Sequence, residues 1–387
     1  MPPFVLIVLF AGAALGNLGL MIACHNWWYG QSLPRNTGKL IHGVHGLLII
    51  ALPFFFWWEF KYDVVAPFSH SPAWHSAVAG YLALCWLIGF VFLPWITWQR
   101  WRRGEPAVVR SVRSQVIDVA KELGGAPVGR GQARWPALLP GNEIFQVEFV
   151  ERELALLRLP AAWDGLTILH LSDLHLNGTP DKSFFRRVMQ VASERGPDLV
   201  CVTGDIADST FHQRWIIPTL GWLRWKVAAF AILGNHDYWY DPPFIRRRLA
   251  RLKMKYLGNS WQKLDVRGEP LIVIGTEYPW AKPQPDLSAC PAGPFRLCLS
   301  HTPDNLPWAK KAGIDLMLSG HVHGGQIRFP VIGSVLVPSR YGRRYDCGTF
   351  HEPPTVLHVS RGLGGEHPLR WGCPPEVTLL TLRRGNV

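Results

Sequence analysis

The alternation of apolar and polar positions divides this chain into two parts. Three apolar runs lie within the first hundred residues, at 4–24, 40–58 and 77–98. Each is close to the ~20 residues that a helix needs to cross the hydrocarbon core of a bilayer. Three such runs in succession are unusual for buried helices of a soluble domain, so the pattern predicts three transmembrane helices. A signal peptide is the alternative for the first run, but it lacks a basic segment before the apolar stretch.

The distribution of basic residues predicts the orientation of these helices. The loop after the first run carries Arg35 and Lys39, whereas the loop after the second has only Lys61 beside Asp63. A larger group follows the third run: Arg100, Arg102, Arg103, Arg110 and Arg113. Because positive residues concentrate on the cytoplasmic side, we expect a multi-pass protein of the cytoplasmic membrane whose C-terminal part faces the cytoplasm. His42 and His45 lie in the second run, where a functional and an interfacial structural role both remain open.

The pattern changes again after the membrane region. Residues 104–142 predict a polar connector, in which 108–123 has a weak helical period and is expected to form a surface helix. From 143 onward, strand-like and helix-like segments alternate, which indicates α/β layering. The expected strands include 166–171, 199–203, 228–233 and 316–319, together with a hairpin of 146–150 and 155–159. The predicted domains are therefore 1–103, 104–142 and 143–387.

Composition adds two constraints. The formal net charge of +12 favours an anionic partner, but charge alone does not choose among nucleic acid, anionic lipid and a phosphorylated substrate. Seven cysteines, an odd number with no CxxC pair, argue against a disulfide framework or a thiolate metal site. Cys290 and Cys298 are able to pair only in an oxidising compartment, and free thiols are the favoured interpretation.

Candidate chemistry stands at the ends of the predicted strands, where α/β folds usually place their sites. The segments are LSDLH, VTGDIAD, LGNHDYW, LSHTPD and LSGHVHGGQ, and their polar residues are Asp173, His175, Asp205, Asn235, His236, Asp237, His301, His321 and His323. Aspartate, imidazole and amide oxygen suit Mn²⁺, Fe²⁺ or Zn²⁺. Each segment alone is ordinary loop or turn chemistry. Five of them in this order, each after a buried strand, predict a metal site.

These five segments resemble the motif series of the calcineurin-like metallophosphoesterases: D-x-H, G-D, G-N-H-D/E, H and G-H-x-H. The resemblance covers about residues 165–325. The variants GHVHGGQ and SHTPD, with SRYGRRY and VSRGLG nearer the C-terminus, are similar to a bacterial branch of membrane-associated phosphodiesterases. That branch includes enzymes resembling the UDP-2,3-diacylglucosamine pyrophosphatases of lipid A biosynthesis.

The resemblance implies a four-layer αββα sandwich, preceded here by the three transmembrane helices, and two divalent metal ions (Mn, Fe or Zn) at one edge. It assigns Asp173, His175 and His323 to the first ion. It assigns Asn235, His301 and His321 to the second, with Asp205 bridging both. His236 would stabilise charge or protonate the leaving oxygen, and Asp237 would orient His236.

Arg340, Arg343 and Arg344 lie beyond the metal motifs. They are candidates to grip a second phosphate of the substrate through bidentate hydrogen bonds. A solvated or lipid-facing basic loop is an equally weighted interpretation.

Three functions follow as hypotheses. The leading one is two-metal hydrolysis of a phosphodiester or pyrophosphate bond in a lipid-linked nucleotide, with membrane lipids and a phosphorylated small molecule as partners. The second is a membrane-tethered phosphodiesterase for soluble nucleotides or nucleic acid, although nucleic acid is the less expected partner. The third, a membrane scaffold with a degenerate enzyme domain, is disfavoured because no motif ligand is missing. Asp237 and the sequence after Asp208 depart from the protein phosphatase pattern, which weakens a phosphoprotein substrate.

Overall fold

The computed structural model describes residues 3–33, 35–62, 72–129 and 134–385, which form two compact units. The first comprises residues 1–104 with 338–342, and the second comprises 105–337 with 343–387. Residues 105–142 of the expected connector are grouped with the second unit.

The first unit consists of apolar helices. They are α1 (Pro3–Tyr29), α2 (Arg35–Tyr62), α3 (Pro72–Trp86), a π-helical turn (Leu87–Phe92) and α4 (Leu93–Trp101). Within the described residues, three stretches are long and apolar enough to cross a membrane: Phe4–Tyr29, Asn36–Phe55 and Ser76–Trp101. These coincide with the three predicted runs.

Small residues bring the first and third spans together. A methyl group at Gly16 would lie 1.8 Å from the carbonyl oxygen of Cys85, and one at Gly89 would lie 2.3 Å from that of Gly12. The Gly12-x-x-x-Gly16 spacing thus lets the helix backbones approach closely, as in membrane helix pairs. On the neighbouring helix α2, the ring centroid of His42 lies 4.3 Å from that of His25.

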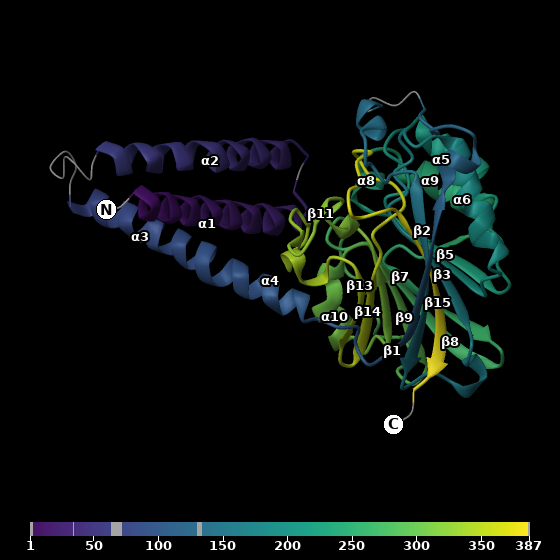
Figure 1. Ribbon diagram of the computed structural model, residues 1–387. Coiled ribbons are helices and arrows are strands. Elements are labelled where there is room, and N and C mark those ends of the chain that lie inside the picture. Colours follow the sequence, from purple (N-terminus) through teal and green to yellow (C-terminus); the bar gives the residue numbers. More distant parts are fainter. Residues whose placement is uncertain (1–2, 34, 63–71, 130–133, 386–387) are drawn as a thin grey trace. The chain divides into compact units, whose positions relative to one another are not determined.

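The second unit is a sandwich of two sheets (Figure 1). In the described residues the larger sheet has the order β1-β2-β15-β3-β4-β5-β6. Its strands are β1 (Val109–Asp118), β2 (Gln146–Leu156), β15 (Glu376–Arg384), β3 (Thr167–Leu171), β4 (Leu199–Thr203), β5 (Ala228–Ile232) and β6 (Lys255–Tyr256). Strands β3 to β6 are parallel, so their carboxyl ends meet at one edge.

The smaller sheet has the order β13-β14-β10-β9-β8-β7. Its strands are β13 (Gly348–Glu352), β14 (Thr355–Val359), β10 (Leu316–Ser319), β9 (Phe295–Ser300), β8 (Glu269–Thr276) and β7 (Ser260–Val266). A separate hairpin joins β11 (Arg328–Phe329) to β12 (Gly333–Ser334). The helices of this unit are α5 (Val119–Glu122), α6 (Lys182–Glu194), α7 (Ile216–Leu220), α8 (Asn235–Tyr238), α9 (Pro242–Arg251) and α10 (Leu306–Lys311).

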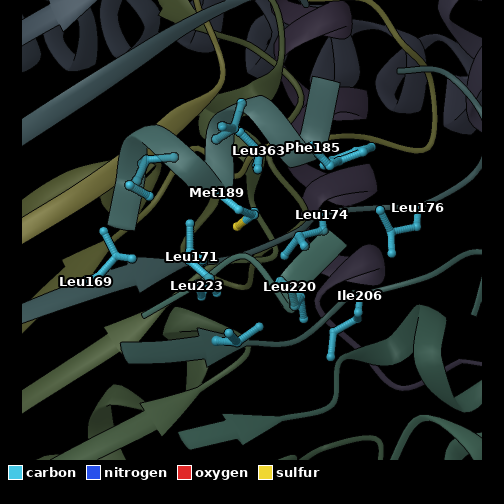
Figure 2. Packing of buried hydrophobic residues seen from close by; sticks show 14 of the residues in the cluster. Leu169, Leu171, Leu174, Leu176, Phe185, Met189, Ile206, Leu220, Leu223 and Leu363 are labelled. Carbon is cyan, nitrogen blue, oxygen red and sulfur yellow. The ribbon is translucent and has the colours of Figure 1, made fainter. Parts of the chain in front are cut away.

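Two hydrophobic clusters hold these layers together. One lies between the larger sheet and its covering helices and includes Met189 and Phe185 of α6 together with Leu169 and Leu171 of β3 (Figure 2). The other fills the space between the sheets and contains Trp163 and Phe230. With α10 beside β14 on the far side, this is the αββα sandwich that the resemblance implied.

Two local predictions were wrong. Residues 108–123 form β1 and the short helix α5 rather than one surface helix, because β1 pairs along its length with β2 at the edge of the sheet. The expected hairpin at 146–159 is the single strand β2. Its charged residues Glu151 to Glu153 read as a turn in the sequence, but they lie on a strand that pairs on both sides.

Candidate metal centre

Five strand ends deliver the predicted polar residues to one edge of the sandwich. The strands β3, β4, β5, β9 and β10 are followed directly by Asp173, Asp205, Asn235, His301 and His321. Five of the predicted site residues have positive φ although they are not glycine: Asp173 (52°), His175 (45°), Asp205 (49°), His321 (70°) and His323 (52°). Such strain persists only where the surroundings hold it, and it is frequent at functional sites.

A first group brings together Asp173, His175 and His323, whose ligand atoms all lie within 4.8 Å of one another. His175 Nδ1 donates to Asp208, 2.9 Å away, so its Nε2 carries the lone pair. That lone pair faces His323 Nε2 at 3.2 Å and Asp205 Oδ2 at 3.6 Å. Ring nitrogens and a carboxylate that converge in this way are satisfied by a metal ion between them or, without one, by a proton on His175.

A second group consists of Asp205, His301 and His321, again within 4.8 Å. His301 Nδ1 lies 2.7 Å from the carbonyl oxygen of Thr203, and therefore donates its proton there. Its Nε2 lone pair then faces Asn235 Oδ1 at 3.0 Å and Asp205 Oδ2 at 3.3 Å. His321 Nε2 is buried without a hydrogen-bond partner. An orphaned nitrogen beside a carboxylate fits a divalent ion, and Asp205 reaches toward both groups.

The electrostatics of the ligands support the same conclusion. Burial disfavours charge on every one of these groups, but three aspartates surround the imidazoles. Although burial alone would lower it, Asp208 and Asp205 raise the pKa of His175 to about 10. Against the same burial effect, Asp205 raises the pKa of His301 to about 9. Without metal ions, the surplus of negative charge keeps protons on His175 and His301. Protons and metal ions compete for the same lone pairs of these rings.

Two glycines allow this close assembly. A methyl group at Gly234 would lie 2.2 Å from Asp205 Oδ1, and one at Gly320 would lie 1.8 Å from Ser172 Oγ. A side chain at either position would therefore push apart the loops that carry the ligands.

The carboxylate beside His236 differs from the one expected. Asp208 Oδ1 lies 3.0 Å from His236 Nδ1. Asp237 instead accepts backbone N–H groups of Ile206, Ala207 and Gly234. It therefore ties the loop after β4 to the loop after β5, and Asp208 is the residue placed to orient His236. The signal in the sequence was an acid three residues after Asp205, which on its own is ordinary in a loop.

Two further neighbours of the site were not predicted. Arg370 is fully buried and donates to the carbonyl oxygen of His323 at 3.1 Å, and its position 47 residues beyond that histidine gave no local signal. The Trp280 ring stands edge-on to His301 and His321, with centroid distances of 5.3 and 4.9 Å.

The three candidate substrate arginines are placed differently. Arg344 pairs with Glu352 at 2.9 Å. Arg343 donates to the carbonyl oxygen of Ile332 in the β11–β12 connection. Arg340 belongs to segment 338–342 of the first unit. Their predicted role in binding substrate stays a prediction.

Comparison with known proteins agrees with this geometry. Residues 166–325 match the model of the calcineurin-like phosphoesterases. An uncharacterized metallophosphoesterase of Bacillus subtilis, YkuE, is 31% identical over 267 residues, which cover 67% of this chain and 91% of that protein. The phosphodiesterase YaeI of Escherichia coli is 31% identical over 243 residues, covering 61% of this chain and 88% of that protein.

The chain therefore belongs to the calcineurin-like phosphoesterase family, and it is a metal-dependent phosphoesterase. A zebrafish (Danio rerio) transmembrane protein with a metallophosphoesterase domain is also similar, at 28% identity over 61% of this chain and 57% of that protein. Together with the three candidate spans, this relative supports association with a membrane.

Proposed function

We propose that this protein hydrolyses a phosphodiester or pyrophosphate bond in a lipid-linked substrate at the cytoplasmic face of the membrane. One observation supports it: a complete set of ligands for two ions occurs in one chain with three candidate membrane spans. The group of arginines after the third span, which favours the cytoplasmic side, supports the orientation.

In this proposal Asp173, His175 and His323 hold one ion. Asn235, His301 and His321 hold the other, and Asp205 is shared. Divalent ions held by these residues would supply Lewis-acid chemistry, polarising the phosphoryl oxygens of the substrate and orienting it for in-line displacement.

The chain itself supplies the proton for the leaving oxygen. His236 is held by Asp208 at Nδ1, which leaves its Nε2 directed away from that carboxylate. The ring also packs against Trp239, with a centroid distance of 4.1 Å. An imidazole fixed in this manner donates a proton without reorganisation, as a general acid must. Asp237 keeps the loop in position through its three backbone bonds.

The substrate class is tested with detergent-purified full-length protein and Mn²⁺. We expect release of UMP from UDP-2,3-diacylglucosamine, and much slower release from unacylated UDP-N-acetylglucosamine. The variant His236→Ala should lose about 10²–10⁴-fold in kcat, the range for general acid catalysis. His351→Ala, which removes an exposed histidine, is the matched control and should retain full activity.

Two failures would be distinguishable. Equal turnover of both substrates would favour the soluble-nucleotide alternative. Protein that cleaves bis-p-nitrophenyl phosphate but neither nucleotide would keep the metal chemistry and remove this substrate class.

A further inference from the structure

We propose that the second unit docks on the lipid surface through an aromatic face, made of Trp135, Leu138, Phe329, Val331, Ile332 and Trp371. This face lies outside the metal centre. The proposal stands whether or not the substrate is lipid-linked.

The members of this face are unusually exposed for large apolar side chains. Trp135, Val331 and Trp371 have 71%, 75% and 61% of their surface exposed. Val331, at the tip of the β11–β12 hairpin, also has a φ of 66°, which a β-branched residue rarely adopts. Exposed apolar groups gathered in this way mark interaction surfaces.

Hydrogen bonds connect the three segments that carry these residues. The backbone N–H of Arg328 donates to the carbonyl of Trp371 at 2.8 Å, and Phe329 lies beside the Trp371 ring at 6.5 Å between centroids. Asn142 Nδ2 donates to the carbonyls of Pro136 and Pro368, at 2.7 and 2.8 Å, which ties the segment of Trp135 and Leu138 to that of Trp371.

The surface is attached directly to the catalytic edge. Arg370, next to Trp371, donates through its side chain to the carbonyl of His323 at 3.1 Å. The backbone N–H of Trp371 donates to the carbonyl of Gln326, in the same loop as that histidine. The buried side chain of Arg370 therefore connects the aromatic face to His323, a predicted metal ligand.

Two arguments select a bilayer as the occupant. The first is tethering, because only residues 102–108 separate α4 from β1, and seven residues reach at most about 25 Å. The second is chemistry. Tryptophan with aliphatic neighbours is typical of membrane interfaces, and basic groups beside them complement anionic headgroups. Arg343 contacts the hairpin at Ile332, and the Arg344 side chain is 60% exposed.

The test uses the full-length chain at one copy per nanodisc, in phosphatidylcholine with phosphatidylglycerol. Val331→Cys carries a bimane label, and lipids with a shallow doxyl group act as quencher. We expect doxyl lipid to reduce the fluorescence at least about twofold, since such side chains lie ~5–10 Å deep at the headgroup boundary. Trp222→Cys, which replaces an exposed tryptophan after α7, is the matched control and should not be quenched. The wild-type chain gives the background from Cys24 and Cys347.

A second variant tests the apolar contact itself. Ile332→Asp in the labelled chain should abolish the quenching, while hydrolysis of bis-p-nitrophenyl phosphate stays unchanged and shows that the unit is folded. Omitting phosphatidylglycerol should weaken the quenching of the parent label. Quenching absent at Val331, or equal at Val331 and Trp222, would overturn the proposal. So would shielding of the label only in discs with two copies, which would assign the face to a second copy of the chain.

Discussion

Buried histidines of the second unit fall in two regions, the metal centre and the interior between the sheets. His170 of β3 and His358 of β14 lie between the sheets, with ring centroids 5.5 Å apart. Each has a threonine partner, Thr203 at 2.9 Å and Thr349 at 3.2 Å, and each has one buried nitrogen without a partner. In that respect they match His321.

The difference lies in the carboxylates. Near the inter-sheet pair the acid is Glu376, which is bonded to Arg361 at 2.5 Å. Burial therefore lowers the pKa of His170 to about 4, and burial with the neighbouring His170 lowers that of His358. At the metal centre, Asp208 and Asp205 raise the pKa of His175 and Asp205 raises that of His301, whereas burial and the neighbouring His301 lower the pKa of His321. The unpartnered nitrogen of His321 therefore differs from those of His170 and His358 in its neighbour, because Asp205 beside it is not paired with an arginine as Glu376 is.

The largest test of this comparison is Asp205→Asn. It removes the charge that faces both His175 and His301, so we expect kcat to fall on the order of 10³-fold, as when a group stabilising the transition state is lost. Activity against bis-p-nitrophenyl phosphate and bound metal per chain are measured together. Asp315→Asn is the control, because Asp315 pairs with Arg158 away from the centre and its loss should leave activity intact. A less than tenfold effect at Asp205 would contradict the shared-ligand role.

Asp208→Asn should have a smaller effect. Asp208 does not contact the ring nitrogens that are predicted to bind an ion. It hydrogen-bonds instead to Nδ1 of both His175 and His236. Loss of such an orienting carboxylate typically costs about 10–100-fold in metal affinity or activity. Metal titration with kcat measured at saturating metal separates the two histidines. If kcat remains reduced at saturating metal, Asp208 acts through His236. If kcat recovers fully, Asp208 acts only through His175.

The inter-sheet histidine predicts a dependence of stability on pH. The folded pKa of His170, about 4, lies below its ordinary value of 6.5. Its contribution to stability is therefore complete above pH 6.5 and is lost as the pH falls from there toward 4, where the unfolded chain binds more protons. The loss is on the order of 2 kcal/mol at pH 5.

The variant His170→Gln should flatten that dependence. Thermal unfolding of the full chain in detergent, between pH 7.5 and 5, compares it with wild type and with His351→Gln at an exposed position. Parallel pH profiles for all three proteins would show that His170 does not titrate in this range.

The smallest effect is expected for Arg344→Ala. Its ion pair with Glu352 is exposed, so the free energy of unfolding should change by less than about 1 kcal/mol. A rise in KM for the substrate without a change in stability would assign Arg344 to substrate binding. An unchanged KM would indicate instead that Arg344 belongs to the basic groups beside the aromatic face.

Much of the candidate site can be predicted from short stretches of the sequence. Asp173 and His175 follow an apolar strand, and the other motifs likewise follow apolar strands. Parallel strands then carry all of them to one edge. The three spans are equally local, because length and hydropathy within one segment define them. The sequence by itself therefore determined the family, the expected ligands and the candidate membrane spans.

Only the tertiary structure decided which groups meet. Asp208 rather than Asp237 reaches His236, because Asp237 is occupied by three backbone N–H groups. Residues 109–118 form a strand because they pair with β2, a contact that the local sequence pattern does not predict. Arg370 and the aromatic face depend on contacts between segments far apart in the chain. Distances between loops, and the competition of acids for the same donors, are set by packing and not by spacing along the sequence.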